Sequence, residues 1–159
     1  ERALQAAVAC ALAGADRVVD LFSGAGTLGL PLADRATLHC FENDAGLLEA
    51  LAHGVRHTQG IKSVTTSTRD LFRNPVDHTD LKPFNAAIID PPRAGAEQQV
   101  GQLAQSDLRD IAMVSCNPVS FARDAALLSN GGYLLKWIEV VDQFRWSPHI
   151  EIVAHFSKV

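Results

Sequence analysis

Apolar residues along the chain follow two alternating patterns, short continuous runs and a helical repeat. Leu4, Val8 and Leu12 recur at helical spacing within residues 1–13, and Gly14 predicts the end of that helix. The same reasoning predicts further helices over residues 27–33, 45–59, 97–106 and 120–129. Runs of strand length, rich in apolar or β-branched residues, predict strands at residues 17–22, 38–42, 64–68, 86–90, 111–115, 133–141 and 150–156.

Apart from the stretch between residues 68 and 86, strands and helices alternate over residues 17–129, which is the order that produces a doubly wound α/β fold with a mostly parallel sheet. The last two predicted strands, 133–141 and 150–156, have no helix between them. Because strands joined without a crossover pair antiparallel, they predict an antiparallel C-terminal hairpin at the edge of a seven-stranded sheet. The 159 residues suit one domain with a substantial core.

A glycine-rich segment directly follows the first predicted strand. Gly24-Ala25-Gly26-Thr27-Leu28-Gly29 matches G-x-G-x-x-G, in which glycines let the backbone approach a ligand closely. Glu42 ends the next strand, where an acid can accept hydrogen bonds from ribose hydroxyls. The pattern fits a nicotinamide dinucleotide, S-adenosylmethionine, or a turn without a ligand. Asp20 favours S-adenosylmethionine, because a carboxylate repels a pyrophosphate and attracts a cationic methionyl group.

Two later segments carry more specific chemistry. Asp90-Pro91-Pro92-Arg93-Ala94-Gly95 follows the fourth strand, so Asp90 borders the crevice where ligands bind in such sheets. Ser115-Cys116-Asn117-Pro118 leaves the fifth strand at the same edge, before a helix whose N-terminus favours a thiolate. Each segment has a plainer interpretation, since Asp-Pro-Pro is a good turn and a lone cysteine is often a small buried hydrophobe.

Taken together, these segments resemble the RNA uracil-C5 methyltransferases of bacteria and archaea, which act on ribosomal and transfer RNA. They occur in the order found in that family and cover nearly the whole chain. The matching segments are Asp20-Leu21-Phe22-Ser23-Gly24-Ala25-Gly26-Thr27, Phe41-Glu42, Asp90-Pro91-Pro92-Arg93-Ala94-Gly95, Ser115-Cys116-Asn117-Pro118 with Ala122-Arg123-Asp124, and Pro148-His149-Ile150-Glu151. The combination of the cysteine segment with the late His-x-Glu is highly specific.

The resemblance implies a Rossmann-like class I fold that binds S-adenosylmethionine and methylates carbon 5 of a uridine in RNA. It implies that Cys116 is the nucleophile and that Glu151 is the general base. The residues that it places in the cofactor site, with the glycines of the loop, are Phe22, Gly24, Gly26, Thr27, Glu42, Asp70 and Asp90. The match around Asp70 is looser than the others.

Arg93, Arg123 and His149 are candidates for contacts with the uracil or with an RNA phosphate. Arginines near a crevice are as often simple ion-pair partners, and His149 is equally consistent with a surface residue. Phe144 and Trp146 are candidates for stacking on a flipped base, or for packing beneath the sheet edge.

The charge of the chain does not by itself suggest RNA binding. The formal net charge is −4, whereas a nucleic-acid-binding domain usually carries a basic face. The resemblance implies an N-terminal RNA-binding domain, absent from residues 1–159, that supplies the attraction to ribosomal or transfer RNA. We therefore expect residues 1–159 to be the catalytic domain of a longer protein.

The remaining composition narrows the setting and the alternatives. Three cysteines without metal-type spacing predict no metal or iron–sulfur cluster in this chain and a reducing, cytoplasmic location. No apolar run approaches the length of a membrane span. An amino-methyltransferase of adenine or cytosine shares the Asp-Pro-Pro loop, but it normally has an aromatic residue in place of Arg93 and does not need Cys116. A cofactor-binding module without catalysis is the other alternative.

Overall fold

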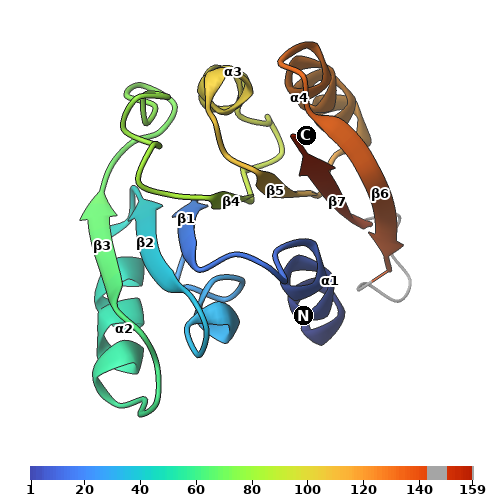
Figure 1. Cartoon of the computed structure of the whole chain (residues 1–159). Coiled ribbons are helices and arrows are strands. Elements are labelled where there is room, and N and C mark those ends of the chain that lie inside the picture. The colour runs from blue at the N-terminus through green and yellow to red at the C-terminus, as the bar shows by residue number, and fades with distance from the viewer. Residues whose placement is uncertain (143–149, 159) are drawn as a thin grey trace.

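The computed structural model describes residues 1–142 and 150–158, whose strands form a single seven-stranded sheet. The strand order is β3-β2-β1-β4-β5-β7-β6 (Figure 1). The strands are β1 Arg17–Leu21, β2 Thr37–Glu42, β3 Val64–Thr68, β4 Ala86–Ile89, β5 Asp110–Ser115, β6 Leu134–Val141 and β7 Glu151–Ser157. β1 to β5 pair in parallel, and β7 is antiparallel to both of its neighbours. The predicted mostly parallel sheet with an antiparallel C-terminal hairpin is confirmed.

The C-terminal hairpin is not simply added at the edge in chain order. β7 lies between β5 and β6, so β6 forms the edge of the sheet and the last strand lies inside it. The burial of β7 agrees with this position, since Val153, Ala154 and Phe156 have no exposed surface. The insertion brings the start of β7 beside the end of β5.

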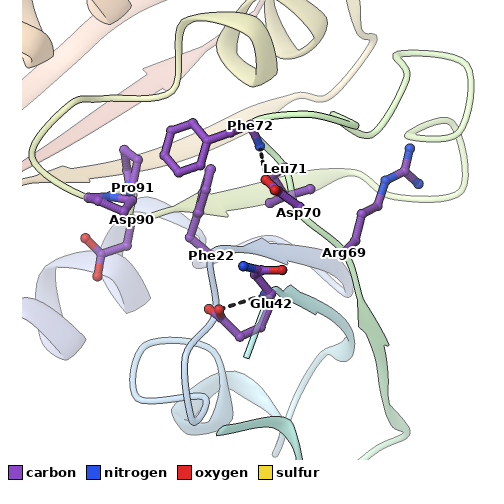
Figure 2. Close-up of a pocket in the computed structure, with 10 residues that line it drawn as sticks. Phe22, Glu42, Arg69, Asp70, Leu71, Phe72, Asp90 and Pro91 are labelled. Atoms are coloured by element: carbon purple, nitrogen blue, oxygen red, sulfur yellow. Dashed lines mark hydrogen bonds between the residues drawn. The ribbon is translucent and has the colours of Figure 1, made fainter. Parts of the chain in front are cut away.

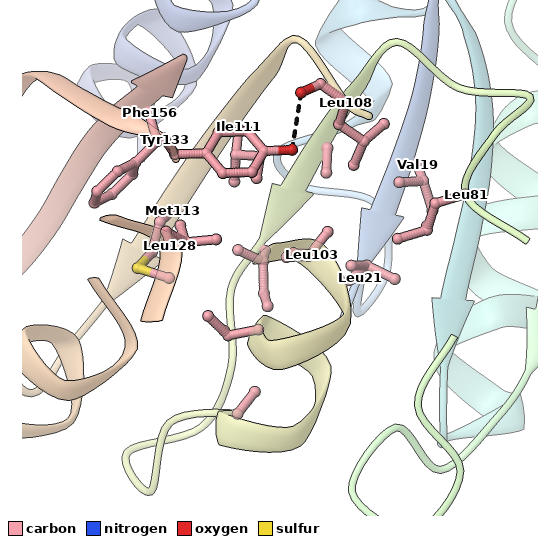
Figure 3. Close-up of a cluster of buried hydrophobic side chains, with 14 of the residues drawn as sticks. Val19, Leu21, Leu81, Leu103, Leu108, Ile111, Met113, Leu128, Tyr133 and Phe156 are labelled. Atoms are coloured by element: carbon pink, nitrogen blue, oxygen red, sulfur yellow. Dashed lines mark hydrogen bonds between the residues drawn. The ribbon is translucent and has the colours of Figure 1, made fainter. Parts of the chain in front are cut away.

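Helices cover both faces of the sheet. They are α1 Arg2–Ala11, α2 Ala45–Arg56, α3 Glu97–Gln105 and α4 Pro118–Asn130. α1 and α2 lie on one face, and α3 and α4 lie on the other (Figure 1). Strand residues alternate between these faces, so Val18 packs with α1 while Val19 and Leu21 pack in the cluster that contains α3 residues (Figure 3). No helix among the described residues is long and apolar enough to cross a membrane.

The short helix predicted over residues 27–33 is present only in part, and it is not an α-helix. The segment forms successive turns that end in one short 3-10 helix, η1 (Leu30–Leu32). In an α-helix the residue at position 31 would donate its N–H to the Thr27 carbonyl, but Pro31 has no N–H. The Thr27 carbonyl instead accepts a hydrogen bond from the Gln5 side chain (2.9 Å), so α1 supports the glycine loop.

The helix after Cys116 begins two residues earlier than predicted. Asn117 is its N-cap, and the Asn117 side chain accepts a hydrogen bond from Val119 N (3.1 Å). Pro118 then occupies the first helical position, where a missing N–H has no cost. Cys116 therefore lies between the end of β5 and the cap of α4, with only Asn117 separating it from the helix.

Candidate active site

Two adjoining cavities open at the edge of the sheet where the parallel strands end. The first has a volume of about 430 Å³ and is lined by Phe22, Glu42, Asn43, Arg69, Asp70, Leu71, Phe72, Asp90, Pro91 and Pro92 (Figure 2). The second has a volume of about 330 Å³ and is lined by Glu1, Leu4, Thr27, Leu28, Asp90, Val114, Cys116 and Glu151. Asp90 lines both cavities, so they meet just beyond the end of β4.

Three backbone N–H groups orient the Glu42 carboxylate at the end of β2. Gly24 N donates to Oε2 (3.0 Å), while Asn43 N and Asp44 N donate to Oε1 (2.7 and 3.0 Å). Each carboxylate oxygen can accept further hydrogen bonds. Glu42 is therefore a pre-oriented acceptor on the wall of the first cavity, which is the arrangement that a ribose contact requires.

Two phenylalanine rings border the first cavity, and sequence reasoning identified only one of them. Phe22 has a φ of 61°, which is uncommon for a residue other than glycine, and its ring lies 5.3 Å from that of Phe72 (Figure 2). Asp70 Oδ1 accepts hydrogen bonds from Phe72 N (3.0 Å) and Arg73 N (3.3 Å), so Asp70 shapes the turn that presents Phe72. Phe72 lies in a loop, where no periodic pattern could mark it.

The glycine loop packs too closely for side chains at two of its positions. A Cβ on Gly26 would collide with Leu30 and Leu51, and Gly26 also has a φ of +86°. A Cβ on Gly29 would collide with the carboxylate of Asp20. The glycines therefore let the loop lie directly against the sheet and its helices.

Asp20 is buried behind the glycine loop and is not among the residues that line either cavity. Its Oδ2 has no hydrogen-bond partner. Burial, with smaller contributions from the negative charges of Asp90 and Glu42, raises the pKa of Asp20 to about 8. Immediately behind the candidate site, the Asp20 carboxyl group therefore keeps its proton to a higher pH than an ordinary aspartate does.

Cys116 and Glu151 come together because β7 is antiparallel to β5. The register of these strands ends with Ser115 paired to Ile152, and Cys116 and Glu151 are the residues directly beyond that last pair. Both side chains line the second cavity with Asp90. The predicted nucleophile and the predicted base therefore border the same space.

Two carboxyl groups of the second cavity have raised pKa values. Burial, and then the negative charge of Glu151, raise the pKa of Asp90 to about 6. Burial also raises the pKa of Glu151. Glu1 is a third carboxylic residue on the wall of this cavity, and a cavity lined by carboxyl groups attracts a cation and disfavours a phosphate. The chemistry available here is a thiol, a proton acceptor with a raised pKa and an acidic wall.

Arg93 and Arg123, which we predicted as substrate contacts, line neither of these two cavities. Arg123 forms an ion pair with Asp124 (2.7 Å) and donates to Ala94 O (3.0 Å). Arg93 is exposed, and its backbone carbonyl accepts a hydrogen bond from Asn117 Nδ2 (2.9 Å). The Arg123 side chain thus makes contacts within the protein, and the suggested contacts of both arginines with uracil or phosphate stay predictions.

The other candidates and cysteines are placed as follows. His149, Phe144 and Trp146 lie within residues 143–149, outside the described part of the chain, and their suggested roles stay predictions. Cys10 is exposed on α1, and Cys40 is buried in β2, where burial raises the pKa of its thiol. Within residues 1–142 and 150–158, no group of three or more His, Cys, Asp or Glu residues is placed to hold a metal ion.

The fold is that of S-adenosylmethionine-dependent methyltransferases. A magnesium protoporphyrin IX methyltransferase from Synechocystis PCC 6803, solved with bound S-adenosylmethionine, aligns with a TM-score of 0.73 over 99% of this chain and 79% of its own, at 15% identity. This comparison concerns the fold alone. The tRNA (uracil-54, C5)-methyltransferase of Pyrococcus abyssi, solved with S-adenosyl-L-homocysteine, aligns with a TM-score of 0.75 over 89% of this chain and 34% of its own, at 30% identity.

Residues 57–159 match the family model of tRNA (uracil-5-)-methyltransferases, and the chain belongs to that family. An "Uncharacterized RNA methyltransferase" of Brucella suis biovar 1 (strain 1330) is 48% identical over 99% of this chain. The 23S rRNA (uracil(1939)-C(5))-methyltransferase of Acinetobacter baylyi is 33% identical over 91% of this chain. The chain spans 38% of the length of the Brucella protein, and the alignment with the Acinetobacter protein spans 32% of that protein. The family resemblance seen in the motifs is confirmed.

Proposed function

We propose that this chain carries the catalytic site of an enzyme that transfers a methyl group from S-adenosylmethionine to carbon 5 of a uridine in ribosomal or transfer RNA. The observation that carries the proposal is that Cys116, Glu151 and Asp90 line one cavity, which adjoins a second at Asp90. Membership of the tRNA (uracil-5-)-methyltransferase family supports the same reaction. The names of the Pyrococcus abyssi and Acinetobacter baylyi relatives, both uracil-C5 methyltransferases, also support it.

The first cavity and the glycine loop fit S-adenosylmethionine in size and chemistry. The volume of about 430 Å³ lies within the range of roughly 300–1,000 Å³ that is common for small-molecule sites. The residues that we assign to the cofactor share a place on this cavity or on the glycine loop. They are Phe22, Gly24, Gly26, Thr27, Glu42, Asp70 and Asp90, with Phe72 added beside Phe22. The carboxyl groups around the junction favour the positively charged sulfonium over a phosphate-bearing cofactor.

Cys116 begins the proposed reaction. Carbon 5 of uracil is a weak nucleophile, so the Cys116 thiolate first forms a bond to carbon 6, and the electrons of the 5,6 double bond move to give an enolate. S-adenosylmethionine supplies, when bound, the electrophilic methyl group that carbon 5 of the enolate takes up. Cys116 must therefore approach the ring from within the second cavity, close to the junction with the first.

Glu151 completes the proposed reaction. After methyl transfer, carbon 5 still carries its proton, and the Glu151 carboxylate removes it. The electron pair of that bond restores the 5,6 double bond, and the bond between carbon 6 and sulfur breaks to release Cys116 as a thiolate. Burial raises the pKa of Glu151, which makes its carboxylate a stronger base than an exposed glutamate.

The RNA partner requires more than this chain supplies. With a formal net charge of −4, the chain lacks the general attraction to phosphate that RNA-binding proteins use. We assign that attraction to a part of the longer protein outside residues 1–159. Arg93, Arg123 and His149 stay candidates for RNA contacts, and Arg123 also forms an ion pair with Asp124.

The experiment that tests this function is a methylation assay with the full-length protein, labelled S-adenosylmethionine and unmodified transfer and ribosomal RNA. We expect 5-methyluridine with the wild-type protein and no product with Cys116→Ala. With Glu151→Gln we expect methylated RNA to stay attached to Cys116 as a denaturant-resistant complex, because the carbon 5 proton is not removed.

Other outcomes would contradict the proposal in distinct ways. Label on an amino nitrogen of adenine or cytosine, unaffected by Cys116→Ala, would favour the amino-methyltransferase alternative. Clear binding of S-adenosylhomocysteine without methylation of either RNA would favour a cofactor-binding module that lacks catalysis.

A further inference from the structure

The loop that carries Asp90 is tied to the segment that carries Cys116 by side chains at the start of α4. Residues 90–96 join β4 to α3 without helix or strand. The carbonyl oxygen of Arg93 accepts hydrogen bonds from Asn117 Nδ2 (2.9 Å) and from Ser120 Oγ (3.0 Å). We call these two side chains, with the Arg93 carbonyl, the cross-loop latch.

Further contacts from α4 anchor the other end of the same loop. Asp124 is 2% exposed, and its Oδ2 accepts a hydrogen bond from Ala96 N (2.9 Å). Arg123 donates to Ala94 O (3.0 Å), and a Cβ on Gly95 would collide with both side chains. Because these contacts do not depend on the latch, they hold residues 94–96 in place when the latch is removed.

The oxygen and the nitrogen of the Asn117 carboxamide both form hydrogen bonds, and together they connect the segment that bears Cys116 to this loop. It follows Cys116 directly, and its Oδ1 accepts from Val119 N (3.1 Å) as the N-cap of α4. Its Nδ2 donates in the other direction, to Arg93 O. A single planar group therefore holds the backbone that bears Cys116 at a set distance from the backbone that follows Asp90.

We propose that Asn117 is a positioning residue for methyl transfer, whose bond to Arg93 O sets Cys116 relative to the point where the two cavities meet. The inference rests on the proposed function, because it gives Asn117 a part in the attack of Cys116 on uracil. That attack depends on alignment of the sulfur with carbon 6, and a displacement of about 1 Å lowers such rates by roughly 100-fold. A role as a helix cap alone predicts no such loss when the cap is kept.

The test replaces Asn117 by serine in the full-length protein. Serine caps helices as well as asparagine does but has no amide to donate to Arg93, so we expect a melting temperature within about 4 °C of the wild type. The assay is formation of the covalent complex with RNA that contains 5-fluorouridine, which accumulates because fluorine cannot leave as a proton does. We expect the maximal rate to fall roughly 10- to 100-fold, with a much smaller change in the RNA concentration at half-maximal rate.

Two matched measurements separate positioning from general damage. Val119→Ala, in the same helical turn and with a side chain that is 80% exposed, should keep the wild-type rate. Alkylation of Cys116, scored in the same digest against the exposed Cys10, should change little in Asn117→Ser because the thiol itself is untouched. Amide hydrogen exchange within residues 90–96 should become faster in Asn117→Ser and not in Val119→Ala.

The outcomes keep this inference distinct from the proposed function. A wild-type rate in Asn117→Ser, or unchanged exchange in residues 90–96, would overturn the latch. Equal losses of complex formation, alkylation and melting temperature would also overturn it, because they would identify Asn117 as a cap only. A wild-type protein that forms no covalent complex would overturn the proposed function, and hydrogen exchange would still decide whether the latch holds the loop.

Discussion

The substitution Asp20→Asn tests the electrostatics behind the glycine loop most directly. Asp20 is 1% exposed, and its Oδ2 has no hydrogen-bond partner. Burial is the main reason that its pKa is raised from 3.8 to about 8, and the charges of Asp90 and Glu42 add to this effect. Asparagine has nearly the same shape without a titrating proton, so the variant isolates the cost of ionising this side chain.

The direction of the pH dependence follows from the raised pKa. Asp20 loses its proton near pH 3.8 in the unfolded chain, whereas the folded protein keeps it until about pH 8. The stabilising effect of the bound proton is therefore complete below pH 3.8 and is lost by pH 8, at about 1.4 kcal/mol for each pH unit. The full span corresponds to about 5–6 kcal/mol, and relaxation around the ionised group reduces it. We expect Asp20→Asn to be more stable than the wild type by roughly 1 kcal/mol at pH 5 and roughly 3–5 kcal/mol at pH 8.

Urea unfolding curves of both proteins at pH 5, 6.5 and 8 measure this difference. A stability difference between the two proteins that stays constant over this range would refute the reasoning. The difference grows with pH only if the folded wild type holds a proton on Asp20 that the unfolded chain has lost. The same substitution should weaken binding of S-adenosylmethionine more than binding of S-adenosylhomocysteine at pH 8. The first ligand carries the sulfonium charge that an ionised Asp20 attracts, and the second does not.

Two further predictions concern the glycine loop. Gly29→Ala should lower the free energy of unfolding by roughly 1–3 kcal/mol, because its Cβ would collide with a buried carboxylate, whereas Gly101→Ala has open space in α3 and should raise it by about 0.5–1 kcal/mol. Urea unfolding measures both, and changes of the same sign would contradict the argument. Gln5→Ala removes the bond to Thr27 O (2.9 Å) and should weaken S-adenosylhomocysteine binding severalfold in calorimetry, with a stability loss of about 1 kcal/mol. Gln105→Ala loses a comparable bond to a carbonyl in α3, so equal affinities of the two variants would count against a role for Gln5 in the loop.

Local patterns of apolar residues predicted the strands well because strand formation depends on neighbouring positions. The run at residues 86–90 and the run at 111–115 both became central strands, buried on both faces. At residues 27–33 the helical repeat gave only a short 3-10 helix, because one proline removes a donor that a longer helix needs. The apolar residues of this segment pack in the cluster that contains α1 and α2 residues.

The candidate site was predictable as a set of motifs at the carboxyl ends of strands. Glu42, Asp90 and Cys116 each follow or end a parallel strand, so simple topology places them at one edge. Phe72 was missed because its position depends on a turn shaped by Asp70, which has no repeating pattern. The motif left Arg123 open as a contact for uracil or phosphate or as a simple ion-pair partner, and the structure adds its ion pair with Asp124 and its hydrogen bond to Ala94 O.

The sequence by itself determined the fold class, the glycine loop and the family motifs, because these depend on residue type and on short spacing along the chain. Only the tertiary structure decided which side chains share a cavity. The insertion of β7 between β5 and β6 brings Glu151 to the same cavity as Cys116, although they are far apart in the chain. The partner of a strand is set by the burial of both of its faces between two helical layers, and that is a property of the whole fold rather than of any segment.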